Sequence, residues 1–209
     1  VTINSMFLDC NSLTFMDLSD YDILNTTGFS KFCPNLSTLT VVYDSTIFKS
    51  AIVSNSPNVN WINVGTYILS GFTSNTNSVT IKINGTNNTV TPNSNKFFRI
   101  STSLQTAITS LDEMLMNQEY VTTVIIGKYI NTANLQSMQD VFRGCIGLTK
   151  IYGLKFLNTQ NVTTFNDLFL GCSVLESIEG VQNWDTSRVT NMSNLLQSCP
   201  AITDITPIS

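Results

Sequence analysis

A unit that recurs at a fixed spacing constrains this chain more than any other feature. Five copies are centred on a cysteine, and the same frame extends to two copies that have another residue there. The seven centres are Cys10, Cys33, Ser56, Gln118, Cys145, Cys172 and Cys199. The first three centres follow a 23-residue period and the last four follow a 27-residue period, with apolar residues at positions −4, +3 and +6 of each copy. A fixed period of this length predicts a solenoid, because each unit packs only against its neighbours.

The residues before each centre have the apolar spacing of a short helix. In one copy these residues are Phe165, Leu168, Phe169 and Cys172, which fall within an arc of about 100° on a helical wheel. Threonine at position −9 of three copies provides an N-cap, and glycine or proline next to the centre provides a stop. A short extended segment follows in each copy. The sequence therefore predicts an α/β solenoid, a leucine-rich-repeat-like array with one short helix and one short parallel strand per repeat.

The period divides the chain into three segments. Residues 1–64 hold three units at the 23-residue period, and residues 106–209 hold four at the 27-residue period. Within residues 65–105 the frame is lost, but residues 79–83 alternate cleanly and are followed by Asn84-Gly85, a strong hairpin signal. We expect a β-hairpin insert here; the alternative is a degenerate repeat, with residues 79–83 as another strand of the array. Because the end units show no polar cap, we also expect the parent protein to continue in at least one direction.

Composition narrows the classes of function. The net charge is −4 and the chain has no histidine, so the commonest general base and metal ligand is missing and no basic stripe exists for nucleic acid. No segment is apolar for long enough to insert into a bilayer. We expect no catalytic residue, cofactor or metal. The remaining candidate acids, which we interpret as solvated turn and helix-start residues, are Asp17, Asp20, Asp22, Asp112 and Glu113. A carboxylate hydrolase acting on glycans is the enzymatic alternative, and it would need paired acids about 5–10 Å apart.

The five cysteines all occupy one position of the repeat, and their number is odd. A disulfide framework does not fit that arrangement, so we expect buried free thiols in a small apolar slot.

The run Asn183-Trp-Asp-Thr-Ser-Arg-Val-Thr-Asn-Met-Ser-Asn-Leu-Leu-Gln-Ser-Cys199 resembles the BspA-like leucine-rich repeats of bacterial and protist surface proteins. The resemblance is specific in the last three units, looser in residues 1–64 and absent from the insert. It implies an extracellular or surface-displayed array used for adhesion, and it implies no catalytic residues. The resemblance is equally compatible with a phage fibre or another virion protein.

The outward positions of the predicted strands are the candidate binding surface. Aromatic and charged residues at these positions are typical contact anchors. The predicted partner-binding residues are Phe15, Asp17, Trp61, Asn63, Lys150, Tyr152 and Glu179. The alternative is that the aromatic rings pack under the insert or against a flanking domain.

These observations predict a non-enzymatic adhesion or binding module, located outside the cell, on a cell surface or on a virion. Its partner would be a protein or glycan on a host or neighbouring cell. The alternative is a structural subunit or fibre-type component of a phage virion or surface layer, whose partners would be other virion subunits.

Overall fold

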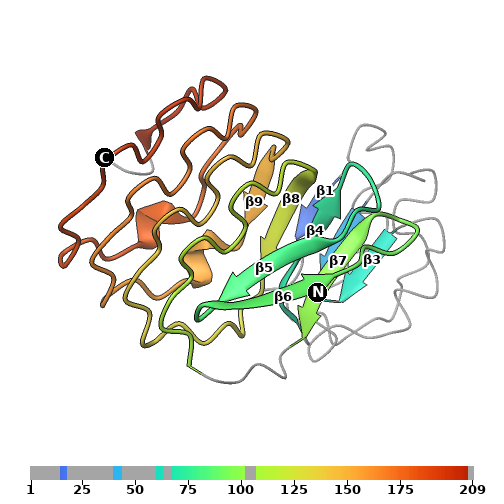
Figure 1. The fold of residues 1–209 in the computed structure, drawn as a ribbon, viewed down its shortest axis with the longest axis horizontal. Coiled ribbons are helices and arrows are strands. Elements are labelled where there is room, and N and C mark those ends of the chain that lie inside the picture. The colour runs from blue at the N-terminus through green and yellow to red at the C-terminus, as the bar shows by residue number, and fades with distance from the viewer. Residues whose placement is uncertain (1–14, 18–39, 44–59, 64–66, 102–106, 207–209) are drawn as a thin grey trace, which may run out of the picture. The chain divides into compact units, whose positions relative to one another are not determined.

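The computed structural model describes residues 15–17, 40–43, 60–63, 67–101 and 107–206 (Figure 1). The chain divides into two compact lobes, Val1–Thr66 and Tyr67–Ser209. Most of the regular structure in the described residues is strand. Their only helices are two short 3-10 turns, η1 (Leu154–Phe156) and η2 (Val181–Asn183). No helix among the described residues is long and apolar enough to cross a membrane.

The N-terminal lobe contains a parallel sheet in the order β1 (Phe15–Asp17), β2 (Thr40–Tyr43) and β3 (Asn60–Asn63). The predicted 23-residue frame is wrong in register. Phe15 pairs with Thr40, and Thr40 pairs with Asn60. The sequence separation of the first pair is longer than the predicted 23 residues, and that of the second pair is shorter. Val41, which has no exposed surface, occupies the same row as Trp61. Register in a sheet is set by the hydrophobic pattern of its strands and is not bound to an even spacing of the repeat centres.

The C-terminal lobe contains a mixed sheet in the order β7 (Phe97–Ser101), β4 (Tyr67–Thr73), β8 (Val121–Ile126) and β9 (Lys150–Tyr152). Strands β8 and β9 are parallel, and Thr123 pairs with Lys150, which confirms the 27-residue register. Strand β4 runs antiparallel to both β7 and β8. The structure also contains the antiparallel hairpin of β5 (Val79–Ile83) and β6 (Thr86–Val90). Its turn is Asn84-Gly85, with φ values of 50° and 75°, as a two-residue hairpin turn of this type requires.

Four repeats of the longer period follow the hairpin, and we number them 1 to 4 by their centres Gln118, Cys145, Cys172 and Cys199. The residues from −9 to −1 of each repeat form an irregular segment that we call the arc, namely 109–117, 136–144, 163–171 and 190–198. Figure 1 shows these repeats as successive adjacent turns of the chain, from yellow-green to red. Isolated parallel bridges join Ser110 to Ser137, Ser137 to Thr164 and Thr164 to Asn191.

Hydrogen bonds between neighbouring arcs hold these repeats together. In each of the three contacts, the N–H groups at −7, −5, −3 and −1 donate to carbonyls of the next repeat, at 2.7 to 3.2 Å. Between repeats 1 and 2 the pairs are Leu111 to Ser137, Glu113 to Gln139, Leu115 to Val141, and Asn117 to Arg143. Most of the N–H groups between these positions bond to a carbonyl within the same arc. Since neighbouring arcs accept these bonds, the backbone needs no helix to satisfy its donors.

The predicted helix in each repeat is therefore wrong. Residues at −5 and −1 adopt the left-handed conformation, which interrupts an α-helix. The residues at −5 are Glu113, Asp140, Asp167 and Asn194, and those at −1 are Asn117, Gly144, Gly171 and Ser198. Asn, Asp and Gly are the residues that best tolerate this conformation. The apolar positions −7, −4, −3 and 0 of the predicted stripe are nevertheless buried in repeats 2 and 3, for example Met138, Val141, Phe142 and Cys145.

The thiols at the repeat centres form a regular column. Each donates a hydrogen bond to the carbonyl oxygen at −3 of the preceding repeat. The three bonds are Cys145 Sγ to Leu115 O at 2.9 Å, Cys172 Sγ to Phe142 O at 3.0 Å, and Cys199 Sγ to Phe169 O at 2.9 Å. These three cysteines are free and buried, as predicted. Cys10 and Cys33 lie outside the described residues.

The buried thiols predict a loss of stability at alkaline pH. Burial raises the pKa of Cys145 to about 12, and burial next to two other thiols also raises the pKa of Cys172. The unfolded chain releases these protons near pH 9 while the folded chain keeps them. The free energy of unfolding should therefore fall above pH 9, by about 1.4 kcal/mol per pH unit for each thiol.

Urea titrations of the protein and of Cys145→Ala between pH 8 and pH 10.5 test this expectation. The variant should lose stability with a shallower slope, because one buried thiol is gone. Equal slopes would contradict the protonation argument, whatever the difference in absolute stability.

Candidate functional site

Two of the predicted binding residues of the C-terminal lobe, Lys150 and Tyr152, lie on β9, and the third, Glu179, lies in the next repeat. Lys150 is exposed and Ile151 is buried, as expected for a strand with one covered face. Tyr152 is half-buried, and Glu179, one repeat further along, is exposed. The ammonium group of Lys150 lies 3.8 Å from Glu176 Oε2, so the surface carries a loose ion pair that spans repeats 2 and 3.

The backbone beneath this surface is fixed by the repeats. The N–H of Thr149 donates to Thr122 O at 2.9 Å, and the N–H of Glu176 donates to Thr149 O at 3.1 Å. Lys150 and Glu176 therefore belong to neighbouring repeats whose backbones are hydrogen-bonded to each other. A backbone fixed in this way loses little entropy when a partner binds to the surface above it. We call the surface formed by Lys150, Tyr152, Glu176 and Glu179 the strand face.

The other four predicted residues belong to the N-terminal lobe. Phe15 and Asp17 lie on β1, and Trp61 and Asn63 lie on β3. Phe15 and Trp61 are not in one row, because Phe15 is in register with Thr40 and Asn60. Their side chains are outside the described part of the structure. The single surface predicted for all seven residues therefore stays a prediction.

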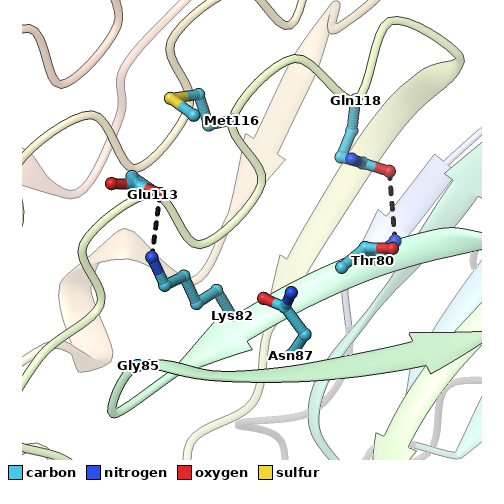
Figure 2. Close-up of a pocket in the computed structure, with 7 residues that line it drawn as sticks. All are labelled: Thr80, Lys82, Gly85, Asn87, Glu113, Met116 and Gln118. Carbon is cyan, nitrogen blue, oxygen red and sulfur yellow. Dashed lines mark hydrogen bonds and ion pairs between the residues drawn. The ribbon is translucent and has the colours of Figure 1, made fainter.

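A polar hollow of about 350 Å³ lies between the hairpin and repeat 1 (Figure 2). Lys82 on β5 extends toward Glu113, and its Nζ lies 2.8 Å from Glu113 Oε2. At the other end, Gln118 Oε1 accepts a hydrogen bond from the N–H of Thr80 at 3.1 Å. Sequence analysis did not identify this site, because it depends on how the hairpin folds back onto the arc. The lining residues are Thr80, Lys82, Gly85, Asn87, Glu113, Met116 and Gln118.

Asn84 holds the hairpin against repeat 1. Its Oδ1 accepts hydrogen bonds from the N–H groups of Thr109 at 2.8 Å and Ser110 at 3.1 Å, and its Nδ2 donates to Ala107 O at 3.2 Å. In repeats 2 to 4, the N–H at −9 instead donates to the −9 carbonyl of the preceding repeat. Repeat 1 has no preceding repeat to accept this bond, and the Asn84 carboxamide accepts it instead.

Acidic residues recur at position −5 and are neutralised by two cations. Glu113 pairs with Lys82, while Arg143 Nη1 lies 3.2 Å from Asp140 Oδ1 and 3.8 Å from Asp167 Oδ2. The left-handed backbone at −5 explains Asp140, Asp167 and Asn194, because Asp and Asn are enriched in this conformation. The backbone conformation therefore explains why acidic residues recur at position −5. Their recurrence at the 27-residue period is the sequence signal that could have revealed this conformation.

The chemistry available at these sites is recognition by hydrogen bonds and charge. The chain has no histidine, and the acid in the hollow is already paired with an ammonium group. No cluster of three or more His, Cys, Asp or Glu residues in the described ranges could hold a metal ion. The hollow offers side-chain amides, an ammonium group and a carboxylate to polar groups of a ligand, and the strand face offers an ammonium group and carboxylates.

The described repeats define a repeat protein whose neighbouring units share one backbone hydrogen-bond pattern. Residues 109–206, just under half of the chain, match the family described as "Mycoplasma protein of unknown function, DUF285". This family is distantly related to leucine-rich-repeat-like repeats of surface proteins, which supports the predicted resemblance at that coarser level. No curated protein and no solved structure matches the chain significantly.

Proposed function

We propose that this chain is a non-enzymatic binding module displayed outside the cell, on a cell surface or on a virion. The module is a leucine-rich-repeat-like solenoid whose strand face contacts a protein or glycan partner. The observation that carries the proposal is the row of exposed charged side chains on β9 and the next repeat, set on a backbone that the repeats hold rigid. The family match covers the same residues, and the family is described as of unknown function.

The strand face has the character of a polar recognition surface. Lys150 keeps 47% and Glu176 keeps 60% of its side chain exposed, so the ion pair between them is open to competition from a ligand. An exposed pair of this kind contributes only about 0–1 kcal/mol to folding. These charges can therefore serve binding with little effect on stability, and Tyr152 adds an aromatic body beside them.

A printed glycan array and a panel of immobilised extracellular-matrix proteins test this proposal, with the unmodified chain as the probe. For each binder found, Glu179→Lys should weaken binding at least about tenfold without changing the melting temperature. The matched control is Glu119→Lys, which makes the same change of charge at an exposed residue outside the strand face. Equal losses in the two variants would show general electrostatics and reject the strand face as the contact surface. The absence of any binder would reject the adhesive function.

The alternative function, a structural subunit of a virion or surface layer, is favoured by a different observation. The last described repeat exposes Met192 and Ile205, at 43% and 58%, where such a subunit would make lateral contacts. Solution mass separates the two functions, because a building block should assemble while a binding module stays monomeric.

A further inference from the structure

The hollow between the hairpin and repeat 1 lies on the polar face of β5. This strand runs beside the arc of repeat 1, where the N–H of Lys82 donates to Met114 O at 2.9 Å. The apolar residues of β5 are buried in the core, so the polar residues between them lie on the opposite face. Lys82 pairs with Asn87 across the hairpin, which places both side chains on that face. The volume of about 350 Å³ is within the range of small-molecule sites, about 300–1,000 Å³.

Repeat 1 differs from the other three repeats at two positions that line the hollow. Position −5 is Asp or Asn in repeats 2 to 4 but Glu113 in repeat 1, and the centre is Cys in repeats 2 to 4 but Gln118 in repeat 1. Glu113 has φ of 58°, a left-handed conformation that Asp and Asn tolerate better than Glu. Backbone strain of this kind is concentrated at functional sites. Both departures from the repeat pattern therefore supply polar groups to the hollow.

The carboxylate of Glu113 keeps one oxygen for a ligand. Its Oε2 lies 2.8 Å from Lys82 Nζ, while its Oε1 has no partner among the described residues. Asp140, at the same position of repeat 2, has partners on both oxygens. Its Oδ1 lies 3.2 Å from Arg143 Nη1, and its Oδ2 accepts a hydrogen bond from Gln139 Nε2 at 2.9 Å. The acid beside the hollow is thus less saturated than its counterpart in the next repeat.

Two carboxamides also keep hydrogen-bonding capacity. Gln118 Oε1 accepts from the N–H of Thr80 at 3.1 Å, which fixes the group and leaves its Nε2 to donate. For the exposed carboxamide of Asn87, the described part of the structure records no hydrogen bond. Figure 2 shows this side chain pointing into the hollow beside Lys82. The hollow therefore presents unused donors and unused acceptors close together.

The ion pair in the hollow determines which ligand fits. Lys82 and Glu113 carry opposite charges, so an anion drawn to the one would also face the other, and the same holds for a cation. A hydroxyl group both donates and accepts, so hydroxyls can bond to Glu113 Oε1 and to an N–H of Lys82 while the pair stays closed. Met116 adds an apolar side for C–H groups. These features fit a neutral ligand with several adjacent hydroxyls.

We propose that the hollow binds a neutral sugar residue. Glu113 accepts a hydrogen bond from one hydroxyl, and Lys82, Asn87 and Gln118 donate to sugar oxygens. The site shares no residue with the strand face, so this proposal does not rest on the proposed function.

The experiment titrates the isotope-labelled full chain with D-glucose, D-galactose, D-mannose and their methyl glycosides, followed by NMR. We expect saturable shifts of the side-chain amides of Asn87 and Gln118 with at least one of these sugars. Binding of its methyl glycoside as well would identify the terminal residue of a glycan as the source, and binding of the free sugar alone would identify a free sugar. The anionic D-glucuronic acid and the cationic D-glucosamine, below neutral pH, should bind more weakly than the best neutral sugar.

A pair of leucine variants tests the contact. Asn87→Leu should weaken sugar binding about tenfold, because a sugar hydroxyl would be left without its partner. The matched control is Asn134→Leu, which makes the same change at an exposed residue outside the lining of the hollow. It should bind the sugar as the unmodified chain does.

Glu113→Gln supplies a readout that a merely structural role would not change. This variant keeps the size of the side chain but leaves the ammonium group of Lys82 unpaired. The affinity for D-glucuronic acid relative to D-glucose should therefore rise about tenfold, since a carboxylate would gain a charge-assisted hydrogen bond.

No binding of any neutral sugar, equal losses in the two leucine variants, or an unchanged ratio in Glu113→Gln would overturn the proposal. A preference of the unmodified chain for either charged sugar would also overturn it. Glu179→Lys, which changes the strand face, should leave sugar binding in the hollow unchanged, so the two proposals can fail independently.

Discussion

Replacing Phe169 with alanine is expected to lower the free energy of unfolding by about 3–5 kcal/mol. Phe169 is 1% exposed and lies in repeat 3, with a neighbour on each side. Its ring stacks on Phe142 with an interplanar angle of 2°, and its N–H donates to Leu195 O at 3.1 Å. Because both neighbouring repeats are held by backbone bonds, the cavity left by the ring cannot close by local collapse. Urea unfolding followed by circular dichroism measures the loss.

Leu196→Ala is the matched control for this variant, because Leu196 occupies the same position −3 in repeat 4. Leu196 is half-buried in the last described repeat, so its truncation removes fewer contacts and the vacated space opens to water. We expect a loss of less than about 2 kcal/mol, below the range for a fully buried leucine. If the two variants lose equal stability, packing between repeats does not dominate the stability of this lobe.

The second large effect is expected at Gly153, where β9 ends and η1 begins. Gly153 has φ of 80°, and a Cβ atom at this position would collide with the carbonyl oxygen of Ile126 in the preceding repeat. Gly153→Ala therefore combines a left-handed backbone cost of roughly 1–2 kcal/mol with an overpacking cost of about 1–3 kcal/mol. The collision involves backbone, which is itself held by the pairing of β8 with β4. Thermal and chemical unfolding should both report a strong loss.

Gly171→Ala separates the two costs. Gly171 has φ of 77°, almost the same as Gly153, but the nearest atoms to its added Cβ lie 3.8 Å away. Only the left-handed backbone cost should appear, so the loss should be about 1–2 kcal/mol. Gly171→Asn should recover part of it, because asparagine tolerates this conformation. A loss at Gly171 as large as that at Gly153 would show that conformation, and not the approach of the neighbouring repeat, is decisive.

The helix that the sequence predicted for each repeat illustrates where pattern reasoning stops. Apolar residues three and four apart fit an amphipathic helix, and they fit equally a series of turns that buries the same side chains. Burial of Phe165, Leu168, Phe169 and Cys172 was therefore predictable, while the backbone that presents them was not. The missed signal was Asp or Asn at −5, in the middle of the supposed helix. A repeated left-handed residue there interrupts the helix and turns the N–H groups toward the neighbouring repeat.

The candidate sites depended on tertiary structure to different degrees. Exposure of Lys150 followed from the alternation of the strand, which is a local property. The hollow between Lys82 and Glu113 joins two different kinds of structure that are distant in the sequence, and no local pattern indicates that contact. The direction of the backbone hydrogen bonds between repeats was equally hidden, because no side-chain pattern indicates it.

The sequence by itself determined the longer period, the buried positions within each of its repeats, the free thiols at three centres and the hairpin at Asn84-Gly85. These are consequences of side-chain size, polarity and turn preference, which act within a short stretch of chain or recur at a constant interval. The tertiary structure alone decided the backbone of the arcs, the register of the N-terminal strands and the covering of one edge by β4 and β5. These depend on where each N–H finds an acceptor, and in the arcs that acceptor often belongs to the neighbouring repeat.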